Sequence, residues 1–135
     1  MQSDPITDLL VRIKNGYLAR KAEVEMPHSR IKEEILKQLK EFGFVGEYMV
    51  VSAEDKKSPK QTMTVELRYD QGTTPAMENF KRVSKPSLRR YIAADQIRPV
   101  MDGFGLLIVS TSHGVMAGHE ARQKKLGGEV IAEIW

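Results

Sequence analysis

The sequence predicts an α+β protein made of two small lobes, an N-terminal α-β-α-β-β lobe and a C-terminal strand-rich lobe with a short helix. Two stretches near the start place apolar residues at helical spacing, which is typical of amphipathic helices. The second half instead contains short apolar runs separated by turn residues, as strands do. With 135 residues, 41% hydrophobic and 29% charged, the chain is long enough for two such lobes and apolar enough to fold.

The N-terminal α/β lobe is expected over residues 1–70 and begins with a helix. Asp4 and Pro5 are typical of a helix start, because proline needs no N–H in the first turn. Ser29 is expected to cap a second helix, and Gly43 to end it in a left-handed conformation. The apolar positions expected to face the core are Ile6, Leu9, Leu10, Ile13 and Tyr17 in the first helix, and Ile31, Ile35, Leu36, Leu39 and Phe42 in the second.

Three strands are expected to complete this lobe. One lies around residues 24–26, a largely apolar one over 44–52, and one over 63–69, where apolar and polar residues alternate. The polar segment 53–60 contains a proline and is expected to be the hairpin loop between the last two strands. The two helices are then expected to cover one side of a small sheet.

Turn residues at 71–75 form the expected connector, and the C-terminal, mostly-β lobe is expected over 76–135. Its expected elements are short strands at 80–84 and 89–92, a helical turn at 93–100, a strand at 106–109, a short helix at 117–125 and a final strand at 130–135.

The positive charge of the chain is concentrated in its second half. The net charge is +3, yet residues 1–75 hold 12 basic and 12 acidic residues, whereas 76–135 hold 9 basic and 6 acidic ones. The segment 79–94 has no acid and contains Lys81, Arg82, Lys85, Arg89 and Arg90. Such a run is typical of a surface that faces phosphates. The alternative is a set of solvated cations that protect an edge strand from aggregation.

No arrangement of residues suited to catalysis or cofactor binding is found. Cysteine is absent, so neither a disulfide nor a thiolate metal site can form. His28, His113 and His119 are spaced too widely for ordinary metal ligation. Ser112 and His113 are adjacent, and on an extended backbone their side chains point apart, which disfavours a serine nucleophile. We therefore expect no enzyme and no cofactor, and a small hydrolase that uses this pair is the least favoured alternative.

The sequence also predicts a cytoplasmic protein without membrane partners. The start of the chain carries Asp4, Asp8 and Arg12 and lacks the apolar core of a secretory signal. The longest strongly apolar run, 106–109, is too short to cross a bilayer.

A group of hydroxyl residues follows the apolar run 106–109. Ser110, Thr111 and Ser112 both donate and accept hydrogen bonds, and Gly114 permits a close backbone approach, which suits ribose 2′-OH groups and base edges of RNA. The alternative is a turn that satisfies its own backbone. Glu129, after two glycines, is suited to accept hydrogen bonds from exocyclic amines or a 2′-OH.

Taken in order, several segments resemble the small-subunit ribosomal protein eight family, in its bacterial or organellar form. They are DPITDLLVRIKN (4–15), PHSR (27–30), LKEFGF (39–44), KPSLRRY (85–91), STSHGVM (110–116), EAR (120–122) and GGEV (127–130), with Trp135 at the end. Each is short, but together they extend over essentially the whole chain, from residue 4 to residue 135, in the same order as in the family.

The resemblance implies a structural protein of the small ribosomal subunit, in the cytoplasm or in an organelle. It implies binding to the central domain of 16S rRNA, a part in assembling the subunit platform, and small-subunit proteins five and twelve as neighbours. In some bacteria, family members also repress translation of their own operon by binding a similar mRNA structure.

The RNA-binding residues that the resemblance implies fall in three motifs. The main motif supplies Ser110, Thr111, Ser112, Gly114, Gly128 and Glu129; the central one supplies Lys85, Arg89 and Tyr91; and Arg12, Ser29 and Arg30 match N-terminal backbone contacts. His113 stands where Lys or Arg is usual, which weakens one phosphate contact because imidazole carries little charge at neutral pH. Lys124 and Lys125, in place of a more glycine-rich approach to the Gly-Gly-Glu turn, are candidates to restore that charge.

We expect a division of labour between these motifs. The cations of segment 79–94 supply salt-sensitive attraction to the RNA backbone, while residues 110–112 and Glu129 recognise shape, ribose and bases. The competing hypothesis is a protein-interaction module whose basic edge only increases solubility.

Overall fold

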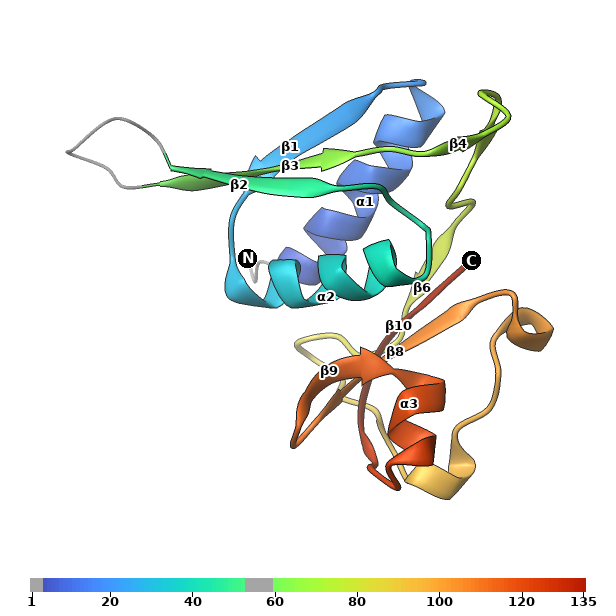
Figure 1. Ribbon diagram of the computed structural model, residues 1–135. Coiled ribbons are helices and arrows are strands. Elements are labelled where there is room, and N and C mark those ends of the chain that lie inside the picture. The colour runs from blue at the N-terminus through green and yellow to red at the C-terminus, as the bar shows by residue number, and fades with distance from the viewer. Residues whose placement is uncertain (1–3, 53–59) are drawn as a thin grey trace. The chain divides into compact units, whose positions relative to one another are not determined.

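In the computed structural model, which describes residues 4–52 and 60–135, the chain forms two compact units (Figure 1). One holds residues 5–77, and the other holds residues 78–135 together with Asp4. Both combine helices with antiparallel sheet, so the predicted α+β class is confirmed. The hairpin loop expected at 53–60 lies, except for Lys60, outside the described residues.

The first unit begins with the expected order α-β-α-β-β, but the strand expected over 63–69 ends at Glu66, and two short strands follow that were not expected. Its elements are α1 (Pro5–Leu18), β1 (Glu23–Pro27), α2 (Arg30–Glu41), β2 (Tyr48–Ser52), β3 (Gln61–Glu66), β4 (Tyr69–Asp70) and β5 (Thr74–Pro75). The sheet is antiparallel in the order β1-β3-β2, and α1 and α2 lie on one side of it (Figure 1). The turn residues at 71–75 belong to a small hairpin in which β4 pairs with β5.

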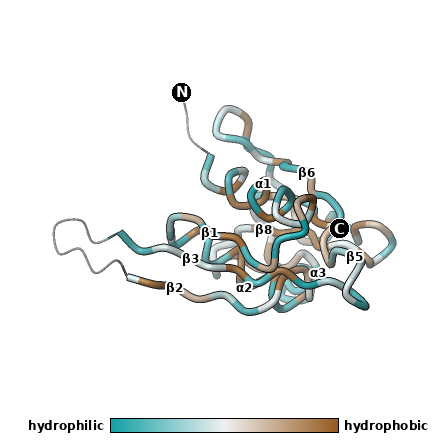
Figure 2. Tube along the Cα trace, turned by 90° about the horizontal axis from the view of Figure 1, so that it is seen from above, coloured by the Kyte–Doolittle hydropathy of each residue, from teal (hydrophilic) through white to brown (hydrophobic). Residues whose placement is uncertain are grey.

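The helices of this unit follow the predicted patterns. The apolar stripe of α1 is buried, and polar and apolar residues alternate along this helix (Figure 2). Ser29 caps α2 by accepting a hydrogen bond from the Lys32 backbone N–H, and Gly43 ends the helix with a φ of +80°. Phe42 was expected in the core and is 39% exposed, because α2 ends one residue before it.

The second strand is shorter than expected. It begins at Tyr48 rather than residue 44. The Phe44 carbonyl accepts a hydrogen bond from the Tyr17 hydroxyl over 2.6 Å, and its N–H donates to the Leu39 carbonyl, so neither group pairs with the sheet. Phe44 and Val45 are buried in irregular backbone that leads into the strand.

A buried lysine in α2 was not anticipated. The Nζ of Lys32 donates to Oδ2 of Asp8 over 3.1 Å and to the Pro27 carbonyl over 3.3 Å. Burial tends to raise the pKa of Asp8, but the hydrogen bonds and charges of Lys32 and Arg12 outweigh it and hold that pKa below its ordinary value. The ion pair thereby joins α1 to α2.

The second unit is mostly strand, as predicted. Its elements are β6 (Phe80–Arg82), β7 (Tyr91–Ile92), η1 (Ala94–Gln96), η2 (Met101–Gly103), β8 (Leu106–Thr111), β9 (Gly114–Ala117), α3 (Gly118–Gln123) and β10 (Gly128–Ile134). The strand order is β6-β10-β8-β9, with β7 also paired to β10. Strand β9 was not expected. Its pairing with β8 extends β8 through Ser110 and Thr111, which were expected in a loop.

Helix α3 packs on β8 and β9 over one buried cluster. The cluster consists of Ile97, Leu107, Val109, Met116, Ala121 and Val130. The pairing of β10 with β8 shifts between Val130 and Ala132, so the two parts of β10 differ in register. None of the helices in the described part of the chain combines the length and the hydropathy that a bilayer crossing requires.

Candidate nucleic-acid interface

Glu129 occupies the centre of a row of side chains that crosses three strands. It is paired with Tyr91 of β7 on one side and with Ser110 of β8 on the other. Residues paired across antiparallel strands present their side chains on the same face. The ring of Tyr91 is exposed, Ser110 is half-buried, and the Glu129 side chain is 14% exposed. Three predicted site residues from separate motifs therefore lie side by side.

Gly128 makes this row possible. A Cβ at this position would lie 2.1 Å from the Ser110 carbonyl oxygen and 3.2 Å from the Thr111 Cα. Only glycine allows β10 to approach the end of β8 so closely. The residue therefore sets the spacing of the two strands beside Glu129.

The carboxylate of Glu129 is already engaged within the chain. Nη1 of Arg89 donates to its Oε2 over 3.1 Å and to its Oε1 over 3.4 Å. The arginine side chain remains 55% exposed. This ion pair offsets the negative charge of Glu129 and leaves it an oriented acceptor beside a cation.

The hydroxyl residues at the turn between β8 and β9 differ in whether they form hydrogen bonds within the chain. The Thr111 hydroxyl donates to the Gly114 carbonyl over 2.9 Å and accepts from the His113 N–H over 3.1 Å, so it satisfies its own turn. Gly114 adopts a φ of +108°, which favours glycine. Within the described residues, the hydroxyls of Ser110 and Ser112 have no hydrogen-bond partner, and Ser112 is exposed.

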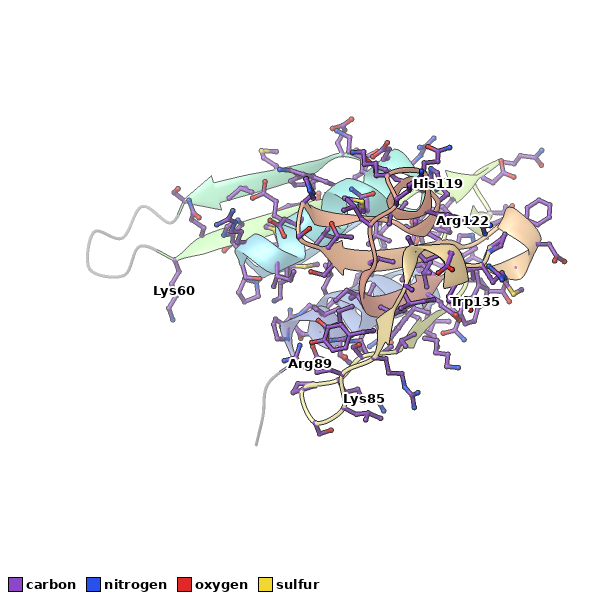
Figure 3. The ribbon with its side chains drawn as sticks, turned by 90° about the horizontal axis from the view of Figure 1, so that it is seen from below. Lys60, Lys85, Arg89, His119, Arg122 and Trp135 are labelled. Atoms are coloured by element: carbon purple, nitrogen blue, oxygen red, sulfur yellow. The ribbon has the colours of Figure 1, made fainter. Side chains whose placement is uncertain are left out.

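The basic motif 85–91 forms a tight turn followed by β7. Lys85 and Leu88 exchange backbone hydrogen bonds of 2.8 and 3.0 Å. Figure 3 shows Lys85 and Arg89 on the same loop, well apart from His119 and Arg122 of α3.

A buried serine anchors this turn. The Ser84 hydroxyl accepts from the Arg90 N–H over 2.9 Å and donates to the Arg90 carbonyl over 3.2 Å, and that carbonyl also accepts from the Val130 N–H over 2.9 Å. The side chain is fully buried. Sequence reasoning missed Ser84, since a serine beside lysines is ordinary in an exposed loop.

The five cations of segment 79–94 lie in three different environments. Lys81, Lys85 and Arg90 are exposed and, together with Arg82, Val83, Leu88 and Glu133, line an open hollow of about 520 Å³. Arg89 is paired with Glu129, as described above.

Arg82 was expected on the phosphate-facing surface, and this expectation is wrong. Its side chain is only 8% exposed: Nε donates to Asp4 Oδ2 over 3.1 Å, and Nη1 donates to the Ile131 carbonyl over 2.6 Å. Side chains alternate between the two faces of a strand, so Lys81 and Arg82 leave β6 on opposite sides, although both contribute to the lining of the hollow. Lys81 is exposed, whereas Arg82 holds the sheet together.

The three N-terminal candidates lie in the first unit. Arg12 donates from Nε to both Asp8 carboxylate oxygens and from Nη1 to the Glu25 carbonyl, and Ser29 caps α2. Arg30 is 94% exposed and lies 3.6 Å from Glu34. Two of the three therefore support the unit internally, while Arg30 extends into solvent.

The sequence is similar to those of known proteins over its whole length. Residues 4–135 match the model of the family described as ribosomal protein S8. The chain belongs to this family. It is 45% identical to small ribosomal subunit protein uS8 of Persephonella marina over the full length of both chains. It is 47% identical to the protein of that name from Exiguobacterium sibiricum, covering 100% of this chain and 99% of the relative.

In this member of the ribosomal protein S8 family, three of the resembling segments meet at the start of β10. Segment 127–130 is paired with the end of 85–91 on one side and the start of 110–116 on the other. The result is one row with an oriented carboxylate, the Ser110 hydroxyl and an exposed aromatic ring, at the strand end that leads into the turn with Ser112. Among the described residues, no group of three or more acidic or histidine side chains is suited to hold a metal ion.

Proposed function

We propose that this chain is a structural protein of the small ribosomal subunit that binds the central domain of 16S rRNA and helps to assemble the subunit platform. Membership of the ribosomal protein S8 family and the names of its relatives support the ribosomal role. The observation that carries RNA binding is the row formed by Tyr91, Glu129 and Ser110, with hydroxyl and basic turns beside it.

The chemistry of this row suits the shallow side of an RNA helix. Double-stranded RNA presents 2′-hydroxyls and base edges in a wide, shallow minor groove, while irregular regions expose base faces. Ser110 and Ser112 offer hydroxyls without internal partners, and Glu129 offers an acceptor oriented by Arg89. The exposed ring of Tyr91 offers a stacking surface.

The exposed cations supply attraction to the RNA backbone. With Arg82 buried and Arg89 paired, three cations of the segment remain: Lys81, Lys85 and Arg90. If each neutralises one phosphate, the duplex coefficient gives a loss of affinity of roughly fortyfold between 50 and 200 mM salt. Five free cations would give a loss of several hundredfold.

An electrophoretic shift titration over this salt range tests the proposal. A folded fragment of the 16S central domain is compared with a scrambled duplex of equal length, and we expect much tighter binding to the folded fragment. Lys85→Ala should reduce the salt slope by roughly one phosphate equivalent, whereas Lys60→Ala, a cation of the first unit, should leave it unchanged. Equal, weak binding to both RNAs would instead favour the protein-interaction module.

We also propose that the same surface binds the mRNA of the chain's own operon and that small-subunit proteins five and twelve are its neighbours. Both follow from the family resemblance. A reporter fused to the operon leader should be repressed by the wild-type chain and released by Ser112→Ala. Unchanged repression by this variant would contradict a shared RNA surface.

A further inference from the structure

Phe104 is the most exposed of the large apolar residues described, at 87%. Met101, three residues earlier, is 57% exposed. Single exposed apolar residues are ordinary on protein surfaces. This pair is different because the backbone that carries it is held in an unusual conformation.

The loop of residues 100–105 is closed and left-handed at its tip. Met101, Asp102 and Gly103 have φ values of 49°, 54° and 95° in succession. The Val100 carbonyl accepts hydrogen bonds from the N–H groups of Gly103 and Gly105, over 2.9 and 3.0 Å. Non-glycine residues in this conformation are costly and cluster at functional sites.

The base of the loop is pinned to the sheet. A Cβ on Gly105 would lie 2.5 Å from a Val100 methyl and 2.9 Å from the Ile134 carbonyl oxygen at the end of β10. The loop therefore presents Phe104 from a fixed base rather than from a long, loose connection.

The charge around this loop differs from that of the RNA-binding surface. At the tip of the loop, the exposed Asp102 has no ion pair or side-chain hydrogen bond among the described residues, and segment 100–105 contains no cation. Before the loop, the guanidinium of Arg98 donates to the carbonyls of Asp95 and Ile97, and that of Arg122 donates to the Ile97 carbonyl, so both cations are held at segment 95–97. A locally acidic, apolar tip repels a polyanion and attracts a basic protein surface.

The loop also lies at the far end of β8 from the hydroxyl turn. It precedes the strand, whereas Ser112 follows it, and the six residues of Leu106–Thr111 span about 20 Å. One molecule therefore has room for RNA at one end of this strand and a protein at the other.

We propose that loop 100–105 inserts Phe104 and Met101 into an apolar pocket with a cationic rim on a neighbouring ribosomal protein. The proposal rests on the small-subunit role proposed above, because that role supplies basic protein neighbours. Aromatic residues and methionine are enriched at the centres of protein interfaces, where a few anchors carry most of the binding energy.

A competition experiment tests the docking. Wild-type and variant chains, distinguished by isotope labelling, are mixed in equal amounts and in excess over RNA. They compete for incorporation into small subunits reconstituted from 16S rRNA and the other small-subunit proteins, and separately for 16S rRNA alone. The variants are Phe104→Ser, Asp102→Asn and the control Gln123→Ser, an exposed position on α3. Asparagine tolerates the left-handed conformation, so Asp102→Asn changes the charge without disturbing the loop.

On rRNA alone, we expect all three variants to equal the wild type. In complete subunits, Phe104→Ser should be incorporated about tenfold less than the wild type, as expected for loss of an interface anchor. Asp102→Asn should also be incorporated less than the wild type, and Gln123→Ser should be incorporated equally. Parity of Phe104→Ser in complete subunits would overturn the proposal. Enrichment of Asp102→Asn on either target would also overturn it, by showing that RNA covers the loop. If no chain binds rRNA alone but Phe104→Ser is still depleted from subunits, the docking stands and direct rRNA binding fails.

Discussion

The guanidinium of Arg89 donates to the carboxylate of Glu129 over 3.1 Å, joining a basic turn to the first residues of the final strand. The pair places a carboxylate within a surface proposed to bind a polyanion. Its cost there is reduced because Arg89 offsets the charge and orients the acceptor oxygens. Replacing Glu129 therefore tells whether this carboxylate recognises RNA or only repels it. The affinity for RNA should fall in the first case and rise in the second.

Glu129→Gln should weaken binding to the folded 16S fragment by roughly 1–3 kcal/mol, since an RNA donor would lose its charged acceptor. Glu133→Gln removes the same charge from the same strand, where the residue lies across from Lys81 at the cation-lined hollow. This control should tighten binding and steepen its salt dependence. Filter-binding titrations measure both, and tighter binding by Glu129→Gln would show that this carboxylate only repels RNA.

The two neighbouring hydroxyls of the β8–β9 turn should respond differently to removal. Thr111→Val should lower the free energy of unfolding by about 1–2 kcal/mol, because two hydrogen bonds within the turn are lost. Ser112→Ala should leave stability within about 0.5 kcal/mol and lower RNA affinity by roughly tenfold. Urea unfolding and RNA titration of both variants check this. A stability loss for Ser112→Ala as large as that of Thr111→Val would contradict the assignment.

Two glycines of the interface should differ in how they tolerate alanine. Gly128→Ala places a Cβ against the Ser110 carbonyl and should destabilise the protein by about 3 kcal/mol, because the strands must separate. Gly114→Ala enters open space and should cost about 1–2 kcal/mol through its positive φ alone. Thermal unfolding gives the comparison, and equal losses would indicate that the β10–β8 approach is not tight.

Acid should destabilise the first unit through Asp8 and Glu33. Burial raises the pKa of Asp8, but Lys32 and Arg12 outweigh it, and a hydrogen bond with His28 is the largest influence lowering the pKa of Glu33. A carboxylate with a lowered pKa stabilises the fold above its ordinary pKa, and this stabilisation is lost as the pH falls through the folded-state value. The ordinary values are 3.8 and 4.5, so the free energy of unfolding should decrease below about pH 4.5.

Variants at both positions check this pH dependence. Asp8→Asn should cost about 1–2 kcal/mol at pH 6, since it leaves the buried Lys32 ammonium without its charged partner. Both Asp8→Asn and Glu33→Gln should flatten the acid side of the stability curve. A curve identical to that of the wild type in both variants would place the acid-sensitive groups elsewhere.

Local chemistry made the helices of the first unit predictable. The cap at Ser29 and the left-handed Gly43 act within one helical turn, so neighbouring residues are sufficient to identify them. Strands were predicted less well. β9 was missed because four residues carry little periodic signal, and β2 was extended too far because Phe44 is held by a hydroxyl 27 residues away.

The candidate interface divides in the same way. Its motifs could be found separately, but that Glu129 stands between Tyr91 and Ser110 depends on the register of three strands. Within one basic run, Arg82, Arg89 and Lys85 have the same sign of charge, yet they are buried, paired and exposed, respectively. The partner of Arg82 is Asp4, 78 residues away in sequence, and the partner of Arg89 is Glu129, 40 residues away.

The sequence by itself determined the α+β class, the course of the helices, the concentration of cations in the second half and the likeness to ribosomal protein S8, because each is a property of composition or of adjacent residues. Only the tertiary structure decided which cations face solvent, which hydroxyls lack internal partners and where the motifs meet. Those properties follow from strand register and long-range pairing, which depend on the whole sheet because a shift of one residue reverses the face of every side chain.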